Sequence, residues 1–498
     1  MRYAHEVEKV RTAERALMAR LPEGTLMRRA AAGLAAVCAR LLSSGREVGL
    51  GVYGAPIVLL VGSGDNGGDA LYAGAGLARR GARVTAILAG TKTHEGGLAS
   101  LRAAGGRAVP ATDEAEAAAE IDRADLIIDG MLGIGGRGGL REPYASLAGR
   151  AADSGSVVVA CDLPSGIDAS TGQVDGAAVK ADVTVTFGTY KPGLLVDPGA
   201  RHAGVVELVD IGLGPYLSDP DVCAPRGEDV AAWLPRPTHE SDKYRRGVVG
   251  VLAGGEAFTG AAVLAVGGAV HGGAGMVRFA SSEHPVELVR HRWPEAVTTV
   301  IGDSLDQVGR VQAWVVGPGL GTDERAEALL TQALASDLPV LVDADGLTIL
   351  SRRRDLLWRT PPTLLTPHAG ELARLLGTDA AEVESRRLEH VRRAAEELNA
   401  TVLLKGSTTV IAEAERPVRV NPTGTPWLAT AGTGDVLSGL TGTLLAGGLS
   451  AIDAAAAAAY LHGLAGRLSA DPHADGAAPI SAYDVVDALP AAFRTLSA

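Results

Sequence analysis

Short apolar runs alternate with longer Ala- and Leu-rich segments along the whole chain, and this alternation restricts the folds open to it. The first half contains PIVLLVG, ARVTAILAG, ADLIIDG, SVVVACDLP, DVTVTFG and GVVELVDIG, and the second half GVVGVLAGG, GMVRFASS, AWVVGPGLG, LPVLVDADG, TLLTPHAGE and TVLLKGSTTVIA. Continuous apolar runs are typical of parallel strands that helices cover on both faces. The sequence therefore predicts α/β structure throughout.

The chain divides into two predicted domains. Its 498 residues are too many for one compact core. A segment rich in Pro, Gly and charge, GLGPYLSDPDVCAPRGEDVAAWLPRPTHESDKYRRG, interrupts the alternation near residues 215–240. We predict an N-terminal domain over residues 1–215, a linker over 216–227 and a C-terminal domain over 228–498.

Composition argues against several classes of protein. The net charge of −12 gives no basic footprint for nucleic acid. The opening residues MRYAHEVEKVRTAERALMAR lack the apolar core of a signal peptide, and no run of about 18 apolar residues suggests a membrane span. Three cysteines without metal-ligand spacing favour reduced thiols. We therefore predict a cytoplasmic protein that binds neither nucleic acid nor membrane, and we expect a homo-oligomer.

A glycine loop follows the first long apolar run. The glycines of VGSGDNGGD fit G-x-G-x-x-G, but an ordinary NAD site also requires an acid at the end of the next strand. That strand ends in TAILAGTKTH, which has none. This departure disfavours a dehydrogenase. The loop instead carries Asp65, Asn66 and Asp69 at a strand end, where open α/β sheets bind ligands.

Two further strand ends carry polar side chains. Asp129 follows a buried strand and precedes a glycine loop over residues 133–139, and Asp162 and Ser165 follow the next strand. Oxygen atoms from Asn66, Asp129 and Ser165 would suit a hard cation such as potassium or magnesium. Alternatively, each of these residues is only a turn former or a helix cap.

The motifs VGSGDNGGDAL, DLPSGIDASTG and FGTYKPGLL, with the opening VEKVRTAERA, resemble the YjeF-type N-terminal domain, which epimerises hydrated nicotinamide dinucleotides. The resemblance covers about residues 1–215 and implies a Rossmann-like three-layer α/β/α fold with a K⁺ site at Asn66, Asp129 and Ser165. It also implies substrate contacts at Asp65, Asn66, Gly67, Gly68, Asp69, Gly133, Ile134, Gly135, Gly136, Arg137, Gly138, Gly139 and Asp162.

The chain departs from that family at two positions, since Asp65 stands where Asn is usual and Ala70 where Gly is usual. Asp65 adds negative charge beside a substrate that carries phosphate. Inverting a carbinolamine carbon requires ring opening, or loss and re-addition of water, with proton transfers. We assign these transfers to Asp162 with Lys191, although a lysine in YKPG could equally be a surface charge.

In the second half, WLATAGTGDVLSG places an acid where a helix is predicted to begin. Asp435 precedes apolar residues at helical spacing, and Gly432 and Gly434 flank Thr433. The acid could simply complement the helix dipole. A cap does not require two glycines, however, whereas backbone that closely approaches a phosphate does. The loop therefore predicts a phosphate site beside a carboxylate.

Polar residues also end the neighbouring strands, which favours one nucleotide cleft. They are Asp343 and Asp345, His368 and Glu371, and Lys405 with the turn GSTT. Taken alone, His368 is more typical of a structural polar residue, and a plain hairpin would use a similar turn. No G-x-x-x-x-G-K-[ST] occurs, which argues against a P-loop enzyme.

AGTGDVLSG resembles the ribokinase-like superfamily, in which this carboxylate deprotonates the hydroxyl that accepts phosphate. EAFTGAAVLAVGGAVHGGAGMVR, GPGLG, TPHAGELARL and LKGSTTVIA are more narrowly similar to the ADP-dependent dehydratases of hydrated NADH and NADPH, over about residues 228–498; KGSTT and PHAGE stand for the usual KGADT and PHPGE. The resemblance implies substrate contacts at Ala261, Gly319, His368 and Asp435, and nucleotide contacts at Lys405, Gly406, Ser407, Thr408, Thr409 and Gly434.

Together the resemblances predict a bifunctional metabolite-repair enzyme. Its first domain would interconvert the R and S hydrates of NADH and NADPH. Its second would dehydrate the S hydrate with ADP and Mg²⁺, giving AMP and phosphate, with Asp435 as the base. The alternative is a ribokinase-like kinase of a small alcohol, such as a hydroxymethylpyrimidine or thiazole alcohol, with a non-catalytic ligand-binding first domain.

Overall fold

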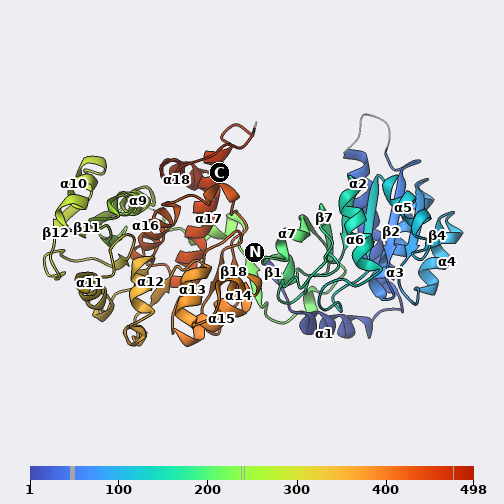
Figure 1. Cartoon of the computed structure of the whole chain (residues 1–498), viewed down its shortest axis with the longest axis horizontal. Coiled ribbons are helices and arrows are strands. Elements are labelled where there is room, and N and C mark those ends of the chain that lie inside the picture. Colours follow the sequence, from blue (N-terminus) through green and yellow to red (C-terminus); the bar gives the residue numbers. More distant parts are fainter. Residues whose placement is uncertain (45–50, 237, 241, 475, 498) are drawn as a thin grey trace. The chain divides into compact units, whose positions relative to one another are not determined.

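The computed structural model of the chain describes residues 1–44, 51–236, 238–240, 242–474 and 476–497. The chain forms two compact units, Tyr3–Asp221 and Val222–Ala498, with Met1–Arg2 belonging to the second (Figure 1). Within the described ranges, no helix is both long enough and apolar enough to cross a membrane.

The N-terminal unit is built on a seven-stranded parallel sheet in the order β4-β3-β2-β5-β6-β7-β8. Its elements are α1 (Val7–Met18), α2 (Thr25–Ser44), β2 (Pro56–Val61), α3 (Asp65–Arg79), β3 (Arg83–Leu88), α4 (Glu95–Ala103), β4 (Arg107–Pro110), α5 (Glu114–Asp122), β5 (Leu126–Gly130), α6 (Tyr144–Asp153), β6 (Val157–Cys161), β7 (Val183–Phe187), η1 (Pro192–Leu194), α7 (Ala200–Ala203), β8 (Val205–Val209) and η2 (Gly214–Tyr216). The first strand of the chain, β1 (Arg2–Ala4), is instead an edge strand of the sheet of the C-terminal unit.

Two hydrophobic cores sandwich this sheet. Along β2, Ile57, Leu59 and Val61 join a core with α2, α3 and α4, whereas Val58 and Leu60 join a core with α5 and α6. Alternate residues of a strand point to opposite faces, so an unbroken apolar run supplies both cores. The predicted three-layer α/β/α fold is confirmed, and all six predicted strands form. The short edge strand β4 was not predicted because it lacks an apolar run.

The C-terminal unit has a mixed sheet in which β16-β15-β14-β13-β10-β11-β12 run parallel, while β16, β17 and β18 form antiparallel pairs and β9 follows β18. Its elements are β9 (Val222–Ala224), α8 (Gly227–Trp233), β10 (Val248–Leu252), α9 (Thr259–His271), β11 (Met276–Ser281), α10 (Glu283–Arg292), β12 (Val297–Val300), β13 (Ala313–Val316), α11 (Glu324–Ala335), β14 (Val340–Val342), α12 (Asp345–Leu350), η3 (Arg354–Leu357), β15 (Thr363–Leu365), α13 (Ala369–Leu376), α14 (Ala380–Ser385), α15 (Arg387–Glu397), β16 (Thr401–Leu404), β17 (Val410–Ala412), β18 (Val418–Val420), η4 (Pro426–Leu428), α16 (Thr433–Ala446), α17 (Ala451–Ala470) and α18 (Ala482–Ser497).

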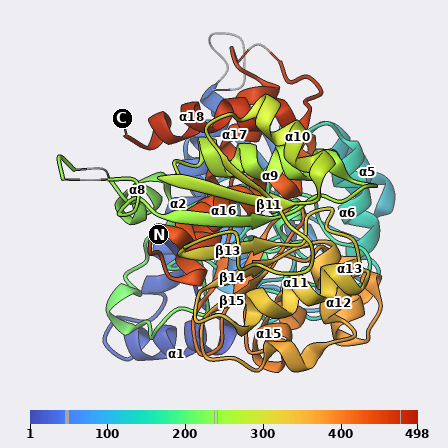
Figure 2. The same ribbon diagram turned by 90° about the vertical axis from the view of Figure 1, so that its left-hand side faces the viewer.

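Helices cover both faces of this sheet as well. Figure 2 shows α9, α10, α16, α17 and α18 on one side and α11, α12, α13 and α15 on the other. The first group packs on the strands through a core that is rich in alanine. The strands predicted from the apolar runs of this half all form, whereas β9, β12 and β18, which are short, were not predicted.

Glycine allows α9 and α16 to pack closely. A Cβ atom added to Gly439 would lie 1.9 Å from the carbonyl oxygen of Ala265, and one added to Gly268 would lie 2.2 Å from that of Val436. Neither position admits a side chain without moving a helix backbone. The contact therefore fixes α16, whose first turn carries Asp435.

Candidate functional site

The first turn of α16 holds Asp435. Gly432, the residue at the helix N-cap, has φ +92°, a left-handed conformation that glycine adopts without steric cost. Burial, with a smaller contribution from the Asp343 carboxylate, raises the pKa of Asp435 to about 7, although Lys405 opposes the shift. This carboxyl group therefore exchanges its proton near neutral pH, which suits a general base.

Lys405, at the end of β16, lies over the same helix start. Its Nζ atom lies 2.8 Å from Asp343 Oδ1 and 3.8 Å from Glu371 Oε2. Burial lowers the pKa of Lys405, but the carboxylates of Asp343 and Glu371 outweigh it, so the pKa is raised and the ammonium group stays charged. A Cβ atom added to Gly434 would lie 3.6 Å from Lys405 Nζ, so the lysine is next to the α16 backbone.

Asp343 links the lysine to α16. Its side chain is buried, and Oδ2 accepts a hydrogen bond of 2.7 Å from the Ser438 hydroxyl. Asp343 follows β14 and Ser438 lies one turn after Asp435, so the bond joins a strand end to the helix. The sequence singled out Asp343 as a strand-end acid, but Ser438 was missed, because a serine within a helix carries no distinctive signal.

The structure also brings Ala261 and Gly319 together. Gly319 has φ +60°, and a Cβ atom added to it would lie 2.9 Å from Ala261 Cβ. Leu264, one turn further along α9, lies beside the start of α16, since a Cβ atom on Gly432 would be 2.4 Å from Leu264 Cδ1. The two predicted substrate contacts thus lie on loops and helix ends next to Asp435.

His368 is the N-cap of α13. Its Nδ1 accepts hydrogen bonds from the backbone N–H groups of Gly370 (3.0 Å) and Glu371 (3.3 Å), while Glu371 Oε2 accepts one from the His368 N–H. This reciprocal pattern is a capping box. The His368 side chain is 60% exposed, so its outer edge can contact a ligand while Nδ1 caps the helix.

The turn over residues 405–409 connects β16 to β17, which pair antiparallel. The plain-hairpin reading is therefore correct as a description of the backbone. It does not exclude nucleotide binding, because the same turn carries Lys405 into the group of charged residues around Asp435.

In the N-terminal unit, a cavity of about 590 Å³ gathers many of the predicted substrate contacts. It is lined by Asp65, Asn66, Asp69, Asp162, Gly133, Ile134, Gly135 and Gly136. Among the described residues, Gly67, Gly68, Arg137, Gly138 and Gly139 do not line it. Gly67 packs instead on the Gly62 carbonyl, and Gly139 on that of Asp175.

Asp162 and Lys191 form a buried ion pair. Lys191 Nζ lies 2.5 Å from Asp162 Oδ1 and also donates to Thr186 Oγ1 and the Phe187 carbonyl. Lys191 is 1% exposed, so the alternative that it is a surface charge is wrong. Asp162 has φ +68°, a conformation rarely adopted by residues other than glycine, and such strain is concentrated at functional sites.

Oxygen atoms converge behind this cavity. Asp129 is fully buried and accepts hydrogen bonds from the Ser165 hydroxyl (2.7 Å) and the Ser165 N–H (2.8 Å). Burial raises the pKa of Asp129 to about 6, and the bonds from Ser165 limit the rise. The Asn66 amide donates to the Leu132 carbonyl, which leaves its own oxygen available.

The same cavity has walls that the sequence did not reveal. Helix α1 contributes Arg11, Glu14 and Arg15. Burial raises the pKa of Glu14, and burial with the nearby Asp162 carboxylate raises that of Asp69 well above its usual range. The α1 residues were missed because a charged amphipathic helix looks the same whether its polar face meets solvent or a cavity.

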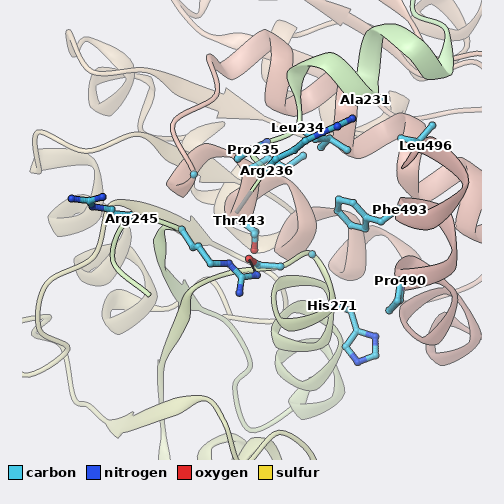
Figure 3. Close-up of a pocket in the computed structure, with 15 residues that line it drawn as sticks. Ala231, Leu234, Pro235, Arg236, Arg245, His271, Thr443, Pro490, Phe493 and Leu496 are labelled. Atoms are coloured by element: carbon cyan, nitrogen blue, oxygen red, sulfur yellow. Dashed lines mark hydrogen bonds between the residues drawn. The ribbon is translucent and has the colours of Figure 1, made fainter. Parts of the chain in front are cut away.

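A different cavity, of about 420 Å³, lies at the other end of α16 (Figure 3). Its walls include Leu234 and Arg236, which follow α8, Phe493 and Leu496 of α18, and Arg245 on a separate loop. None of the predicted site residues lines it. The carboxyl ends of the parallel strands, where Asp343 and Lys405 lie, remain the place where the chemical groups gather.

The fold and these sites define a two-domain α/β enzyme. Residues 23–193 match the family described as YjeF-related protein N-terminus, and residues 249–487 match the NAD(P)H-hydrate dehydratase family. The chain is 48% identical, over the full length of both proteins, to the bifunctional NAD(P)H-hydrate repair enzyme Nnr of Mycobacterium leprae. It is 49% identical to the enzyme of that name from Mycobacterium tuberculosis strain H37Rv, over 92% of each chain. The chain belongs to the family of bifunctional NAD(P)H-hydrate repair enzymes.

A solved ribokinase-like superfamily protein from Enterococcus faecalis is also similar, with 25% identity and a TM-score of 0.50, over 56% of this chain and 98% of that one. The predicted ribokinase-like fold of the second half is confirmed. The family membership supports a repair enzyme over the kinase of a small alcohol that the sequence left open.

Proposed function

We propose that the two sites divide the repair of hydrated NADH and NADPH between them. The C-terminal site dehydrates the S hydrate with ADP, and the N-terminal site interconverts the R and S hydrates. The observation that carries this proposal is the position of Asp435, a carboxyl group with a pKa of about 7 at a helix start beside the Lys405 turn. The strand ends around Asp435 are polar. An anionic substrate bound there can therefore contact the base, Asp435, and the cationic side chain of Lys405.

In the dehydration, Asp435 accepts the proton of the carbinolamine hydroxyl as that oxygen attacks the terminal phosphorus of ADP. The bond from this phosphorus to the bridging oxygen breaks, and AMP leaves. Phosphate is a far better leaving group than hydroxide, so the C–O bond of the phosphorylated hydrate then breaks and phosphate departs. Loss of the neighbouring ring proton restores the dihydronicotinamide.

The backbone N–H groups and Lys405 stabilise the negative charge that develops during phosphoryl transfer. The N–H groups at the start of α16 point toward the phosphate, and helix starts attract anions. Among the described residues, no group of three or more acids, histidines or cysteines is arranged to hold a metal by itself. Mg²⁺ would therefore be held chiefly by the ADP phosphates, with a carboxylate such as Asp345 nearby, where it would neutralise phosphate charge.

In the epimerisation, Asp162 and Lys191 move the protons. Lys191 and the Phe187 N–H both donate to Asp162 Oδ1, while Oδ2 has no hydrogen-bond donor among the described residues. Oδ2 can therefore take the hydroxyl proton of the hydrate, or that of the water that adds back. The buried ammonium group of Lys191 holds Oδ1 of this carboxylate and so orients Oδ2.

A potassium ion would fit behind this pair. Within the part of the chain that the structure describes, the buried Asp129 carboxylate has no cationic partner, and Ser165 donates to it from its hydroxyl and its N–H. Burying an uncompensated charge is costly, and a monovalent cation with oxygen ligands removes that cost. Asn66, Asp129 and Ser165 would hold the ion, which would order the loop over residues 133–136 that lines the cavity. The homo-oligomeric state and the cytoplasmic location stay predictions.

A mixture of the purified chain with both the R and the S hydrates of NADH, ADP and Mg²⁺ tests the proposal. Absorbance of reduced nicotinamide should return until both hydrates are consumed, with one AMP and one phosphate for each NADH. Omitting ADP should stop the reaction. Transfer of phosphate to a stable alcohol product without recovery of NADH would contradict the proposal.

A further inference from the structure

A buried arginine packs against the inner side of the turn over residues 405–409, the turn to which we assign nucleotide contacts. Arg387, at the start of α15, is 1% exposed and is the largest fully buried side chain among the described residues. The helix packs against β16 and β17, the two strands that the turn connects. Arg386 and Arg393 of the same segment are 49% and 43% exposed, whereas Arg387 is directed inward.

Three carbonyl groups of the hairpin converge on this guanidinium. Arg387 Nη2 donates to the carbonyl oxygens of Leu404 (3.2 Å), Lys405 (2.9 Å) and Thr408 (3.2 Å). Nη1 lies 2.5 Å from Glu384 Oε2, a partly exposed carboxylate that balances the charge. Hydrogen bonds from a charged donor are about twice as strong as neutral ones, so the guanidinium fixes the conformation of the turn.

The carbonyl orientation sets the orientation of the N–H groups. In a planar trans peptide the C=O and N–H bonds point in opposite directions. Because the Lys405 and Thr408 carbonyls point at Arg387, the N–H groups of Gly406 and Thr409 point away from it. These two N–H groups, at the two ends of the turn, are therefore on the side from which an anion can approach, since backbone N–H groups turned outward attract anions.

Space under the turn is already filled by this side chain. A Cβ atom added to Gly406 would lie 2.4 Å from Arg387 Nη2 and 2.7 Å from its Cζ. The guanidinium is held by four hydrogen bonds and cannot withdraw easily. The glycine is therefore required for the contact between the turn and the guanidinium.

We infer that Arg387 is the positioning residue of the nucleotide site: by holding the Leu404, Lys405 and Thr408 carbonyls, it turns backbone N–H groups toward the phosphates of ADP. The inference rests on the proposed function, in which residues 405–409 contact the nucleotide. Arg387 contacts neither substrate. It acts through the turn, so its effect should fall on the nucleotide and not on the hydrate.

The test compares Arg387→Lys with Arg386→Lys in the full-length chain. A lysine cannot span three carbonyls as the planar guanidinium does, so Arg387→Lys should raise the KM for ADP about 10-fold while the KM for the hydrate stays within about twofold. Arg386→Lys, a change in the adjacent exposed arginine, should alter neither. A second route to the same defect is Gly406→Ala, which pushes the guanidinium away and should raise the same KM.

Thermal unfolding and direct ADP–Mg²⁺ binding, measured by calorimetry, separate the possible outcomes. A lower Tm with both KM values unchanged would mean that Arg387 only stabilises the fold, which overturns the inference. Lys405→Ala separates an error in the role of Arg387 from an error in the position of the nucleotide site. If Lys405→Ala weakens ADP binding and Arg387→Lys does not, only the positioning role of Arg387 is wrong. If Lys405→Ala also leaves ADP binding unchanged, the turn is not the nucleotide site and the proposed function loses this assignment.

Discussion

Lys405 Nζ and Asp343 Oδ1 lie 2.8 Å apart at the carboxyl ends of two strands that flank β15. The pair keeps the Lys405 ammonium group charged beside Asp435. The Asp435 carboxylate itself has no hydrogen-bond donor among the described residues. The two acids therefore have different roles: Asp343 holds Lys405, and Asp435 can titrate near neutral pH. Four predictions and a final measurement follow from this geometry and its counterpart in the N-terminal unit.

Lys191→Met should abolish epimerisation and spare dehydration. The change removes the cation that pairs with Asp162 and leaves a largely buried carboxylate uncompensated. In a mixture of the R and S hydrates with ADP, recovery of NADH should then stop once the S hydrate is consumed. Chromatographic separation of the residual epimers checks this result. Arg80→Ala, an exposed arginine of the same unit, is the control and should give full recovery. Complete recovery with Lys191→Met would remove Lys191 from the mechanism.

Replacing potassium by a large organic cation should slow epimerisation and leave dehydration unchanged, because only the N-terminal unit has the oxygen cluster around Asp129. Asp129→Asn should produce the same slow epimerisation at any potassium concentration, since it removes the charge that the ion balances. Rates measured in both directions with separated R and S hydrates test the prediction. An unaltered epimerisation rate in the absence of potassium would show that the oxygen atoms around Asp129 bind no catalytically important ion and only stabilise the loop over residues 133–136.

Gly439→Ala should destabilise the C-terminal unit by about 1–3 kcal/mol, because the added methyl group meets the Ala265 carbonyl between α9 and α16. Gly260→Ala is the matched control. Gly260 is an exposed helical glycine of the same unit with open space around it, and alanine there should be neutral or stabilising by up to about 1 kcal/mol. Urea unfolding followed by tryptophan fluorescence reports the difference, and equal midpoints for the two variants would disprove the close packing.

Much of the fold could be predicted because the strands that form both sheet centres are continuous apolar runs. Edge strands such as β4 and β12 were missed, since they are short and gain their structure from the neighbouring strand and not from their own pattern. Domain boundaries were predicted near residues 215–240, and the structure passes from one unit to the next at Asp221–Val222.

The candidate sites were partly predictable for a related reason. Asp435, Lys405 and Asp343 follow apolar strands or glycines, so their local sequence indicated a ligand site. Arg387 lies in ESRRLEHVRRAAEEL, where nothing distinguishes a buried arginine from an exposed one. Its role depends on the hairpin that packs against α15, which is a tertiary relationship.

The raised pKa of Asp435 has a consequence for stability. The folded chain binds this proton more tightly than the unfolded chain, so the free energy of unfolding decreases as pH rises from 3.8 to about 7. Asparagine carries no charge to bury. Asp435→Asn should therefore stabilise the chain at about pH 8 relative to the wild type and have much less effect at about pH 4, where both side chains are neutral. Urea midpoints at the two pH values test the sign, and a lower midpoint for the variant at about pH 8 would contradict it.

The most direct measurement is the rate of ADP-dependent NADH recovery from the S hydrate by Asp435→Asn. Loss of the base should reduce kcat about 10²- to 10⁴-fold, while epimerisation in the same sample continues at the wild-type rate. Asp484→Asn, which replaces the first-turn acid of α18, should leave both rates unchanged. If Asp435→Asn dehydrates the hydrate at a near-normal rate, the carboxylate beside Lys405 is not the base, and the assigned mechanism is wrong.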